Sequence, residues 1–113
     1  ISIHLDFALE KVQTEQLAEL VEFTKTATRP YVIMGDFNLD WKNSRTKFAE
    51  LQKITGVKTY KIEDNSMVTY PSKNVRYDWI LVSKELEIRS QKIIKSLVSH
   101  HYAIAAELEL AAN

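Results

Sequence analysis

The chain has 113 residues, 45% of them hydrophobic and 27% charged, with fifteen acidic residues balancing fifteen basic ones. This length suits one small domain with a real core, the hydrophobic content argues against disorder, and the zero net charge provides no long-range attraction to nucleic acid or anionic membranes. Any recognition of phosphate must therefore be local. The sequence has no cysteine, which excludes disulfides and thiolate metal sites and leaves the compartment undecided. No apolar stretch approaches the roughly 20 residues of a membrane span.

The first third of the chain predicts a strand, a helix and a second strand. Residues 1–5 alternate between apolar and polar side chains, as in a half-buried strand. A helix is expected from Leu9 to Lys25, and Pro30 lies beyond its end. The residues that recur at helical spacing are Leu17, Leu20, Val21 and Thr24. Residues 31–34 form a short apolar run with two β-branched side chains, which favours an interior strand.

The rest of the chain predicts a second helix and then a series of strands. Ser44 suits the N-cap of a helix that extends to about Thr55, and Gly56 suits its end. The side chains expected to face inward are Phe48, Leu51 and Ile54. A loop is expected at residues 71–74. Strands are expected over residues 57–60, 67–70, 77–83, 86–94 and 104–110, the first two being the weaker candidates.

Polar side chains directly follow the expected strand at residues 31–34. Gly35 lets the backbone turn and approach a ligand closely, and Asp36, Phe37 and Asn38 come next. In open α/β sheets, ligands bind beyond the carboxyl ends of the strands. Asp36 can accept a proton or orient a water molecule, and Asn38 can both donate and accept hydrogen bonds. The alternative is an ordinary turn, in which Asp and Asn are common.

A carboxylate interrupts the otherwise apolar strand expected at residues 77–83. Burial of Asp78 is costly unless the carboxylate is paired or hydrogen-bonded. Arg76 lies two residues earlier on the same strand face, where it can pair with Asp78 or face a substrate phosphate. A structural ion pair and a functional site therefore both explain the pattern.

Histidines lie near the ends of the first and last expected strands. Ser99, His100 and His101 come just before the last strand. A histidine is the natural general base near neutral pH, and Asp78 is the candidate carboxylate that would fix the tautomer of His101. The alternative is a surface loop that happens to contain two histidines. His4 lies on the polar side of the first strand, where a lone histidine is commonly a structural residue.

Four segments follow one another along the chain: strand-His4-Leu5-Asp6, Gly-Asp-Phe-Asn at residues 35–38, Tyr-Asp-Trp-Ile-Leu-Val-Ser at residues 77–83, and Ser-His-His at residues 99–101. In this order they resemble the endonuclease/exonuclease/phosphatase superfamily. The resemblance covers residues 1–113 but only the C-terminal part of the family domain. It implies an α/β (α+β) fold, namely the C-terminal half of a two-sheet αββα sandwich with mostly antiparallel strands and two helices.

The resemblance implies a metal-dependent phosphoesterase that hydrolyses its substrate with activated water. Asp36 would orient or deprotonate the water, and Asn38 would hold a phosphate oxygen. His101 would act as general base or phosphate ligand with Asp78 bonded behind it, and His4 would contact the phosphate from the opposite side. The cofactor would be a divalent cation, Mg²⁺ or alternatively Mn²⁺. The substrate would be a phosphate ester, whether nucleic acid, phospholipid or small molecule.

The sequence departs from the family in two respects. The family has Ser-Asp-His where this chain has Ser99-His100-His101. As a metal ligand, His100 would favour Mn²⁺ or Zn²⁺; alternatively it would cripple the site and leave a non-catalytic binding or interaction module. The family's N-terminal part supplies an Asn and a metal-binding Glu that are not found in this sequence, so we expect the natural chain to extend upstream of Ile1. Residues 1–113 alone are expected to be inactive and to expose an apolar sheet face that needs the missing half or self-association.

Overall fold

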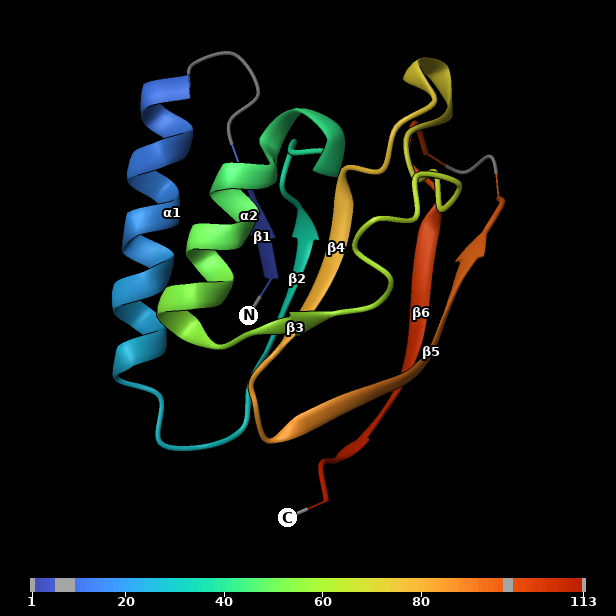
Figure 1. Cartoon of the computed structure of the whole chain (residues 1–113). Helices are drawn as coiled ribbons and strands as arrows, with labels where there is room; N and C mark the ends of the chain where they lie inside the picture. Colours follow the sequence, from blue (N-terminus) through green and yellow to red (C-terminus); the bar gives the residue numbers. More distant parts are fainter. Residues whose placement is uncertain (1, 6–9, 97–98, 113) are drawn as a thin grey trace.

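The computed structural model describes residues 2–5, 10–96 and 99–112. Two helices, α1 (Glu10–Lys25) and α2 (Trp41–Thr55), lie side by side on one face of a four-stranded sheet, and a two-stranded hairpin lies on the other side (Figure 1). This arrangement confirms the expected α+β fold with two helices and two mostly antiparallel sheets. No helix in the described part of the chain is long and apolar enough to cross a membrane.

The larger sheet has the strand order β1-β2-β4-β3. Strand β1 pairs with β2 in parallel, whereas β4 pairs antiparallel with both β2 and β3. The bounds of these strands are β1 (Ser2–His4), β2 (Val32–Asp36), β3 (Lys58–Thr59) and β4 (Asp78–Val82). The register places His4 beside Asp36 and Asp36 opposite Asp78. Three of the polar residues singled out in the sequence therefore meet at one edge of the sheet.

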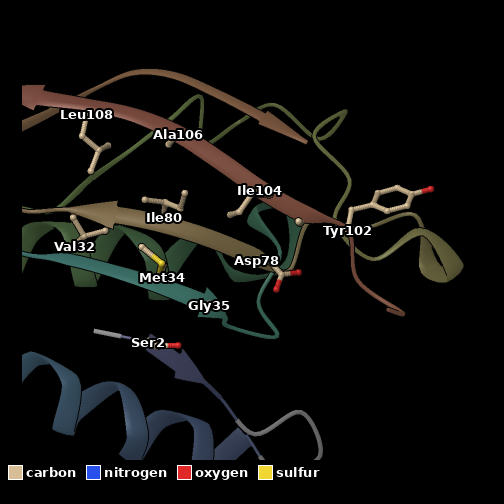
Figure 2. Close-up of a pocket in the computed structure, with 11 residues that line it drawn as sticks. Ser2, Val32, Met34, Gly35, Asp78, Ile80, Tyr102, Ile104, Ala106 and Leu108 are labelled. Atoms are coloured by element: carbon tan, nitrogen blue, oxygen red, sulfur yellow. The ribbon is translucent and has the colours of Figure 1, made fainter. Parts of the chain in front are cut away.

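The smaller sheet pairs β5 (Leu86–Ile94) with β6 (Ala103–Leu110). Strand β6 follows the Ser-His-His segment, as expected from its alternating sequence. The side chains of Ile104, Ala106 and Leu108 on β6 point toward Met34 and Ile80 of the larger sheet (Figure 2). The hairpin thus lies over the sheet face opposite the helices.

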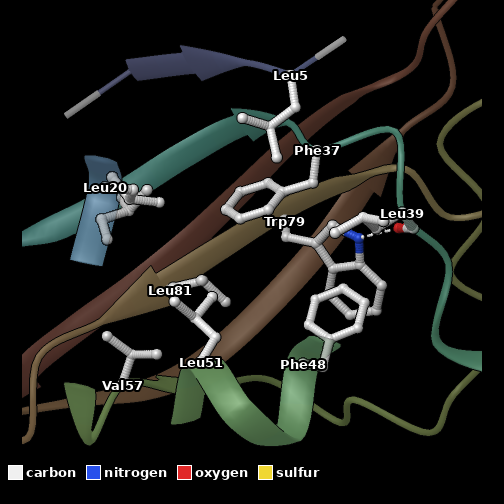
Figure 3. Close-up of a cluster of buried hydrophobic side chains, with 10 residues drawn as sticks. Leu5, Leu20, Phe37, Leu39, Phe48, Leu51, Val57, Trp79 and Leu81 are labelled. Atoms are coloured by element: carbon white, nitrogen blue, oxygen red, sulfur yellow. Dashed lines mark hydrogen bonds between the residues drawn. The ribbon is translucent and has the colours of Figure 1, made fainter. Parts of the chain in front are cut away.

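The hydrophobic core lies between the helices and the larger sheet (Figure 3). At its centre the rings of Phe48 from α2 and Trp79 from β4 lie 4.7 Å apart, and the indole Nε1 of Trp79 donates a hydrogen bond to the carbonyl of Leu39 at 2.8 Å. Phe37 is fully buried in this core. Since Phe37 points into the core, its neighbours Asp36 and Asn38 are left to face the cavity described below.

The helices agree with the sequence apart from two details. Helix α1 ends at Lys25 as expected, and Leu9 lies outside the described residues. Helix α2 begins at Trp41 rather than near Ser44, although Ser44 has a non-helical backbone (φ −132°, ψ 29°) that separates the first turn from the rest. Ile54 is 60% exposed, so its expected inward position is wrong, because it lines an open groove between α1 and α2.

The expected strand at residues 67–70 does not form. Thr69 and Tyr70 instead donate their backbone N–H groups to the carbonyl of Val75, and a single bridge joins Tyr70 to Val75. A 3-10 turn at Pro71–Lys73 lies between them. The chain doubles back too tightly here for a continuous ladder, since proline provides no N–H for one.

Gly35 makes a close backbone contact with strand β1. It adopts φ +140°, and a Cβ placed there would lie 2.0 Å from the carbonyl oxygen of Ile3. Glycine therefore permits the close approach of the neighbouring strand β1 at this position. In the same strand pairing, His4 lies beside Asp36.

Candidate active site

Histidines and carboxylates from four distant segments meet where β1, β2 and β4 approach the loop before β6. His101 Nδ1 lies 2.6 Å from Asp78 Oδ2, and His101 Nε2 lies 3.5 Å from Asp36 Oδ2. On the other side of Asp36, His4 Nε2 lies 3.4 Å from the same Oδ2 atom. The structure thus shows the convergence that the sequence predicts. Asp78 lies against the His101 imidazole, and Asp36 lies beside it.

A cavity of about 280 Å³ opens onto this cluster. The residues that line it are His4, Asp36, Asn38, Tyr70, Lys73, Tyr77 and His101. The side chain of His4 is 74% exposed and that of His101 is 28% exposed, so both imidazoles are accessible to a ligand. Asp78 does not line the cavity and lies behind His101. Tyr70 and Tyr77 were not predicted as site residues, although both lie in stretches that resemble the family.

The pKa of the Asp36 carboxyl is raised above its usual value, mainly because burial disfavours the charged form. The negative charge of Asp78 across the sheet raises it further. The hydrogen bond from the Asn38 backbone N–H to Asp36 Oδ1, 2.8 Å long, acts in the opposite direction, as do His101 and His4. The site therefore holds a carboxylate that would gain from additional positive charge nearby.

Asn38 connects the end of β2 to the end of β1. Its backbone is left-handed, with φ 49°, a conformation that asparagine tolerates better than most residues. Its side-chain Nδ2 donates to the carbonyl of Leu5 at 2.7 Å, while its backbone N–H donates to Asp36. Asn38 is thus fixed in place where it lines the cavity.

Arg76 lies outside the cluster, which corrects the expectation that it binds a substrate phosphate. Its side chain is 3% exposed, and its two terminal nitrogens donate to the carbonyls of Lys61 and Tyr60, each at 2.8 Å. The guanidinium stacks over the ring of Trp79 at 4.0 Å, and burial lowers its pKa to about 10. The spacing from Asp78 suggested a shared face, but Asp78 pairs with His101 instead.

Asp36, Asp78 and His101 form the one group of three or more acidic or histidine side chains, among the described residues, whose ligand atoms lie within 4.8 Å of one another. His100 is exposed and does not belong to this group, so the arrangement gives no support to the expectation that it is a metal ligand. Carboxylate oxygens are the ligands that Mg²⁺ and Mn²⁺ prefer. The carboxylates of Asp36 and Asp78 lie opposite each other on neighbouring strands, and a divalent cation near them would offset their repulsion. These donor groups therefore fit a hard divalent cation.

The sequence matches no protein-family model and no curated protein. The fold does match solved structures. An endonuclease/exonuclease/phosphatase from Bacteroides vulgatus is 21% identical with a TM-score of 0.69, covering 96% of this chain and 48% of that chain. The human nocturnin catalytic domain with bound sulfate is 19% identical with a TM-score of 0.69, covering 97% and 46%. A mannosyl-6-phosphatase from Bacteroides thetaiotaomicron is 15% identical with a TM-score of 0.68, covering 96% and 50%.

The chain therefore has the fold of the endonuclease/exonuclease/phosphatase family. It spans about half the length of the solved structures that it matches, which is consistent with the C-terminal part of that fold. The expected resemblance is confirmed at the level of the fold.

Proposed function

We propose that the chain is the C-terminal part of a metal-dependent phosphoesterase, which hydrolyses a phosphodiester or phosphomonoester with activated water. The observation that carries this proposal is the 2.6 Å contact between His101 Nδ1 and Asp78 Oδ2 at a cavity that Asp36 also lines. Among structures with the same fold, one is a mannosyl-6-phosphatase and another contains a sulfate anion, which shares the tetrahedral shape and negative charge of phosphate.

His101 is the proposed general base. An ionised carboxylate only accepts hydrogen bonds, so Asp78 holds the proton of the neutral imidazole on Nδ1. The Nε2 atom, on the side of Asp36, then has a lone pair available to take a proton from water. Asp78 acts through His101, by fixing the tautomer and stabilising the imidazolium that forms.

The remaining cavity residues orient the reactants. Asp36 orients or deprotonates the attacking water, and its raised pKa suits a group that exchanges a proton. Asn38 and the exposed His4 contact the phosphate from opposite sides of Asp36. Lys73 also lines the cavity and contributes a positive charge where the phosphate would lie.

The proposed cofactor is a divalent cation, Mg²⁺ or Mn²⁺. Of the group formed by Asp36, Asp78 and His101, the Asp36 carboxylate lines the cavity and would hold the cation there, while Asp78 and His101 remain the general-base pair described above. When bound, the cation supplies the positive charge that neutralises a phosphoryl oxygen. The alternative function, a binding module that lost its chemistry at residue 100, receives less support, since His100 is exposed and lies outside the cluster.

The proposal also concerns what covers the apolar groove between β6 and the larger sheet. A groove of about 360 Å³ lies between β6 and the face formed by β2 and β4 (Figure 2). Its lining is mainly apolar and includes Val32, Met34, Ile80, Ile104 and Leu108. Because the chain spans only half of the matching structures, we propose that the other half of the domain, or a second copy of the chain, covers this groove.

The test is hydrolysis by the protein in its natural length, using a chromogenic phosphodiester and phosphomonoester with Mg²⁺ or Mn²⁺. His101→Ala should lower kcat by about 10²- to 10⁴-fold, the scale for a lost acid–base group. His100→Ala is the matched control and should retain near-normal activity. Absence of any metal-dependent hydrolysis by the wild-type protein, or near-normal hydrolysis by His101→Ala, would count against the assignment. A large gain in metal-dependent hydrolysis by His100→Asp would instead favour the alternative function, a binding module that lost its chemistry at residue 100.

A further inference from the structure

Thr69 is a fully buried polar residue that does not touch the candidate cavity. It lies in the irregular segment that the sequence predicted as a strand, just before the 3-10 turn at Pro71–Lys73. A buried hydroxyl is costly unless it is hydrogen-bonded. Its partners therefore show what the residue does in the fold.

The hydroxyl of Thr69 holds the start of β4. Its Oγ1 accepts hydrogen bonds from the backbone N–H groups of Tyr77 and Asp78, each at 3.0 Å. The carbonyl of Tyr77 in turn accepts the N–H of Phe37 at 2.9 Å, next to Asp36. One oxygen atom thus fixes the backbone from which the Asp78 carboxylate extends.

The same segment also holds the loop that carries His101. The carbonyl of Thr69 accepts the N–H of Tyr102, the residue after His101, at 2.7 Å. The ring of Tyr70 packs edge-on against the His101 imidazole, with ring centroids 4.8 Å apart. Thr69 and Tyr70 therefore bind the histidine loop from one side, while the Thr69 hydroxyl binds the start of β4 from the other.

We infer that Thr69 is a positioning residue, which joins the two segments that bring the Asp78 carboxylate and the His101 imidazole into contact. Asp78 and His101 are 23 residues apart in sequence, and no strand pairing joins β4 to β6 in the described residues. Thr69 supplies hydrogen bonds to both sides of this gap. Its effect on hydrolysis rests on the proposed function, whereas its effect on the Asp78–His101 pair does not.

Removal of the hydroxyl should loosen the pair without altering either partner. Thr69→Val has nearly the same shape but leaves the N–H groups of Tyr77 and Asp78 without their acceptor, and Thr69→Ser retains that acceptor. Thr59→Val is a matched control, because Thr59 Oγ1 donates to the carbonyl of Ile80 in the same strand β4, away from the pair.

The primary readout is the NMR signal of the proton on His101 Nδ1, recorded on the protein in its natural length. A hydrogen-bonded, partly buried ring proton exchanges slowly enough to be seen, and it broadens when its hydrogen bond opens. We expect a sharp signal in the wild type, Thr69→Ser and Thr59→Val, and a broadened or lost signal in Thr69→Val. The second readout is hydrolysis, for which Thr69→Val should lower kcat by about 10- to 100-fold, the scale for a misplaced catalytic group, with KM changed less than threefold.

An unchanged His101 signal in folded Thr69→Val would overturn the inference, as would an equal loss in Thr59→Val. If Thr69→Val does not fold, Thr69→Cys replaces it. Its thiol is a weaker acceptor, so the His101 signal should broaden in this variant, and a wild-type signal there would also overturn the inference. If the wild-type protein hydrolyses no phosphate ester, the proposed function fails, and the NMR signal alone decides the role of Thr69.

Discussion

Asp36 and Asp78 lie directly opposite each other on the antiparallel strands β2 and β4. Like charges in this arrangement destabilise a sheet. The His101 imidazole lies between the two carboxylates, with Nδ1 2.6 Å from Asp78 Oδ2 and Nε2 3.5 Å from Asp36 Oδ2, so it would offset their repulsion once it has taken up a proton. The stability of the sheet therefore does not explain why two carboxylates face each other here.

The raised pKa of Asp36 predicts how stability changes with pH. The folded state favours the neutral form of this carboxyl. The stability that the Asp36 carboxyl contributes is therefore fully present below its ordinary pKa of 3.8 and is lost as the pH rises through the raised pKa. Asp36→Asn, which stays neutral, should therefore be more stable than the wild type near neutral pH, and this gain should vanish near pH 3. The measurement is urea denaturation with a chelator present.

Asp64 provides a control of opposite sign. Hydrogen bonds from Ser66 lower the pKa of this exposed carboxyl. The stability that the ionised Asp64 carboxylate contributes is present above the ordinary pKa and is lost as the pH falls through the lowered pKa. Asp64→Asn should lose a little stability near neutral pH, and the loss should fade in acid. A destabilised Asp36→Asn at neutral pH would contradict the assigned effect of burial.

Gly35 and Gly56 both have positive φ, but they differ in surroundings. A Cβ at Gly35 would meet the Ile3 carbonyl at 2.0 Å, whereas a Cβ at Gly56 would meet nothing within 4 Å. Gly35→Ala should cost about 3 kcal/mol of unfolding free energy, at the upper end of ordinary point mutations. Gly56→Ala should cost about 1 kcal/mol from backbone strain alone. Equal costs in chemical denaturation would show that β1 does not pack against Gly35 as described.

Metal binding should depend on Asp36 and not on His100. In the natural protein, Mn²⁺ at about ten times its dissociation constant should add about 1.4 kcal/mol to the unfolding free energy. Asp36→Ala should remove this stabilisation because it deletes a carboxylate from the proposed group, and His100→Ala should retain it. Thermal denaturation with and without Mn²⁺ measures the difference. Loss of the effect in His100→Ala alone would restore that residue as a ligand.

The apolar groove between β6 and the larger sheet should drive association of residues 1–113 when they are produced alone. Met34 lines the groove and is 45% exposed, whereas Phe23 on α1 is 56% exposed and lies outside it. Met34→Lys should reduce self-association measured by sedimentation, and Phe23→Lys should leave it unchanged. A monomeric wild-type chain at high concentration, with cooperative unfolding, would contradict the proposed association.

The elements with strong periodicity were predictable from the sequence, and the irregular segments were not. The alternation in β6 and the helical repeat in α1 gave the correct element types. Residues 67–70 have strand-like composition, but their hydrogen bonds to Val75 and across to β4 make a tight turn that no local pattern encodes. Ile54 matched the helical repeat of α2, yet it lies in an open groove beside α1 and stays 60% exposed.

The site shows the same division. Asp36, Asp78 and His101 were recognisable because polar residues interrupt strands where packing alone would place apolar ones. Arg76 was misassigned, since sequence spacing cannot reveal that two backbone carbonyls and the Trp79 ring hold its guanidinium. Thr69 lies in a stretch, residues 69–72, that also resembles the family, but the sequence indicated no role for it, because its hydrogen bonds join segments that come together only in the folded chain.

The central claim is that Asp78 acts on the reaction only through His101. The most direct measurement is kcat of metal-dependent hydrolysis for Asp78→Asn, His101→Ala and the double variant in the natural protein. We predict that each single variant lowers kcat by about 10²- to 10⁴-fold and that the double variant is within threefold of His101→Ala. Losses that multiply in the double variant would contradict the claim, because Asp78 would then have a role independent of the imidazole.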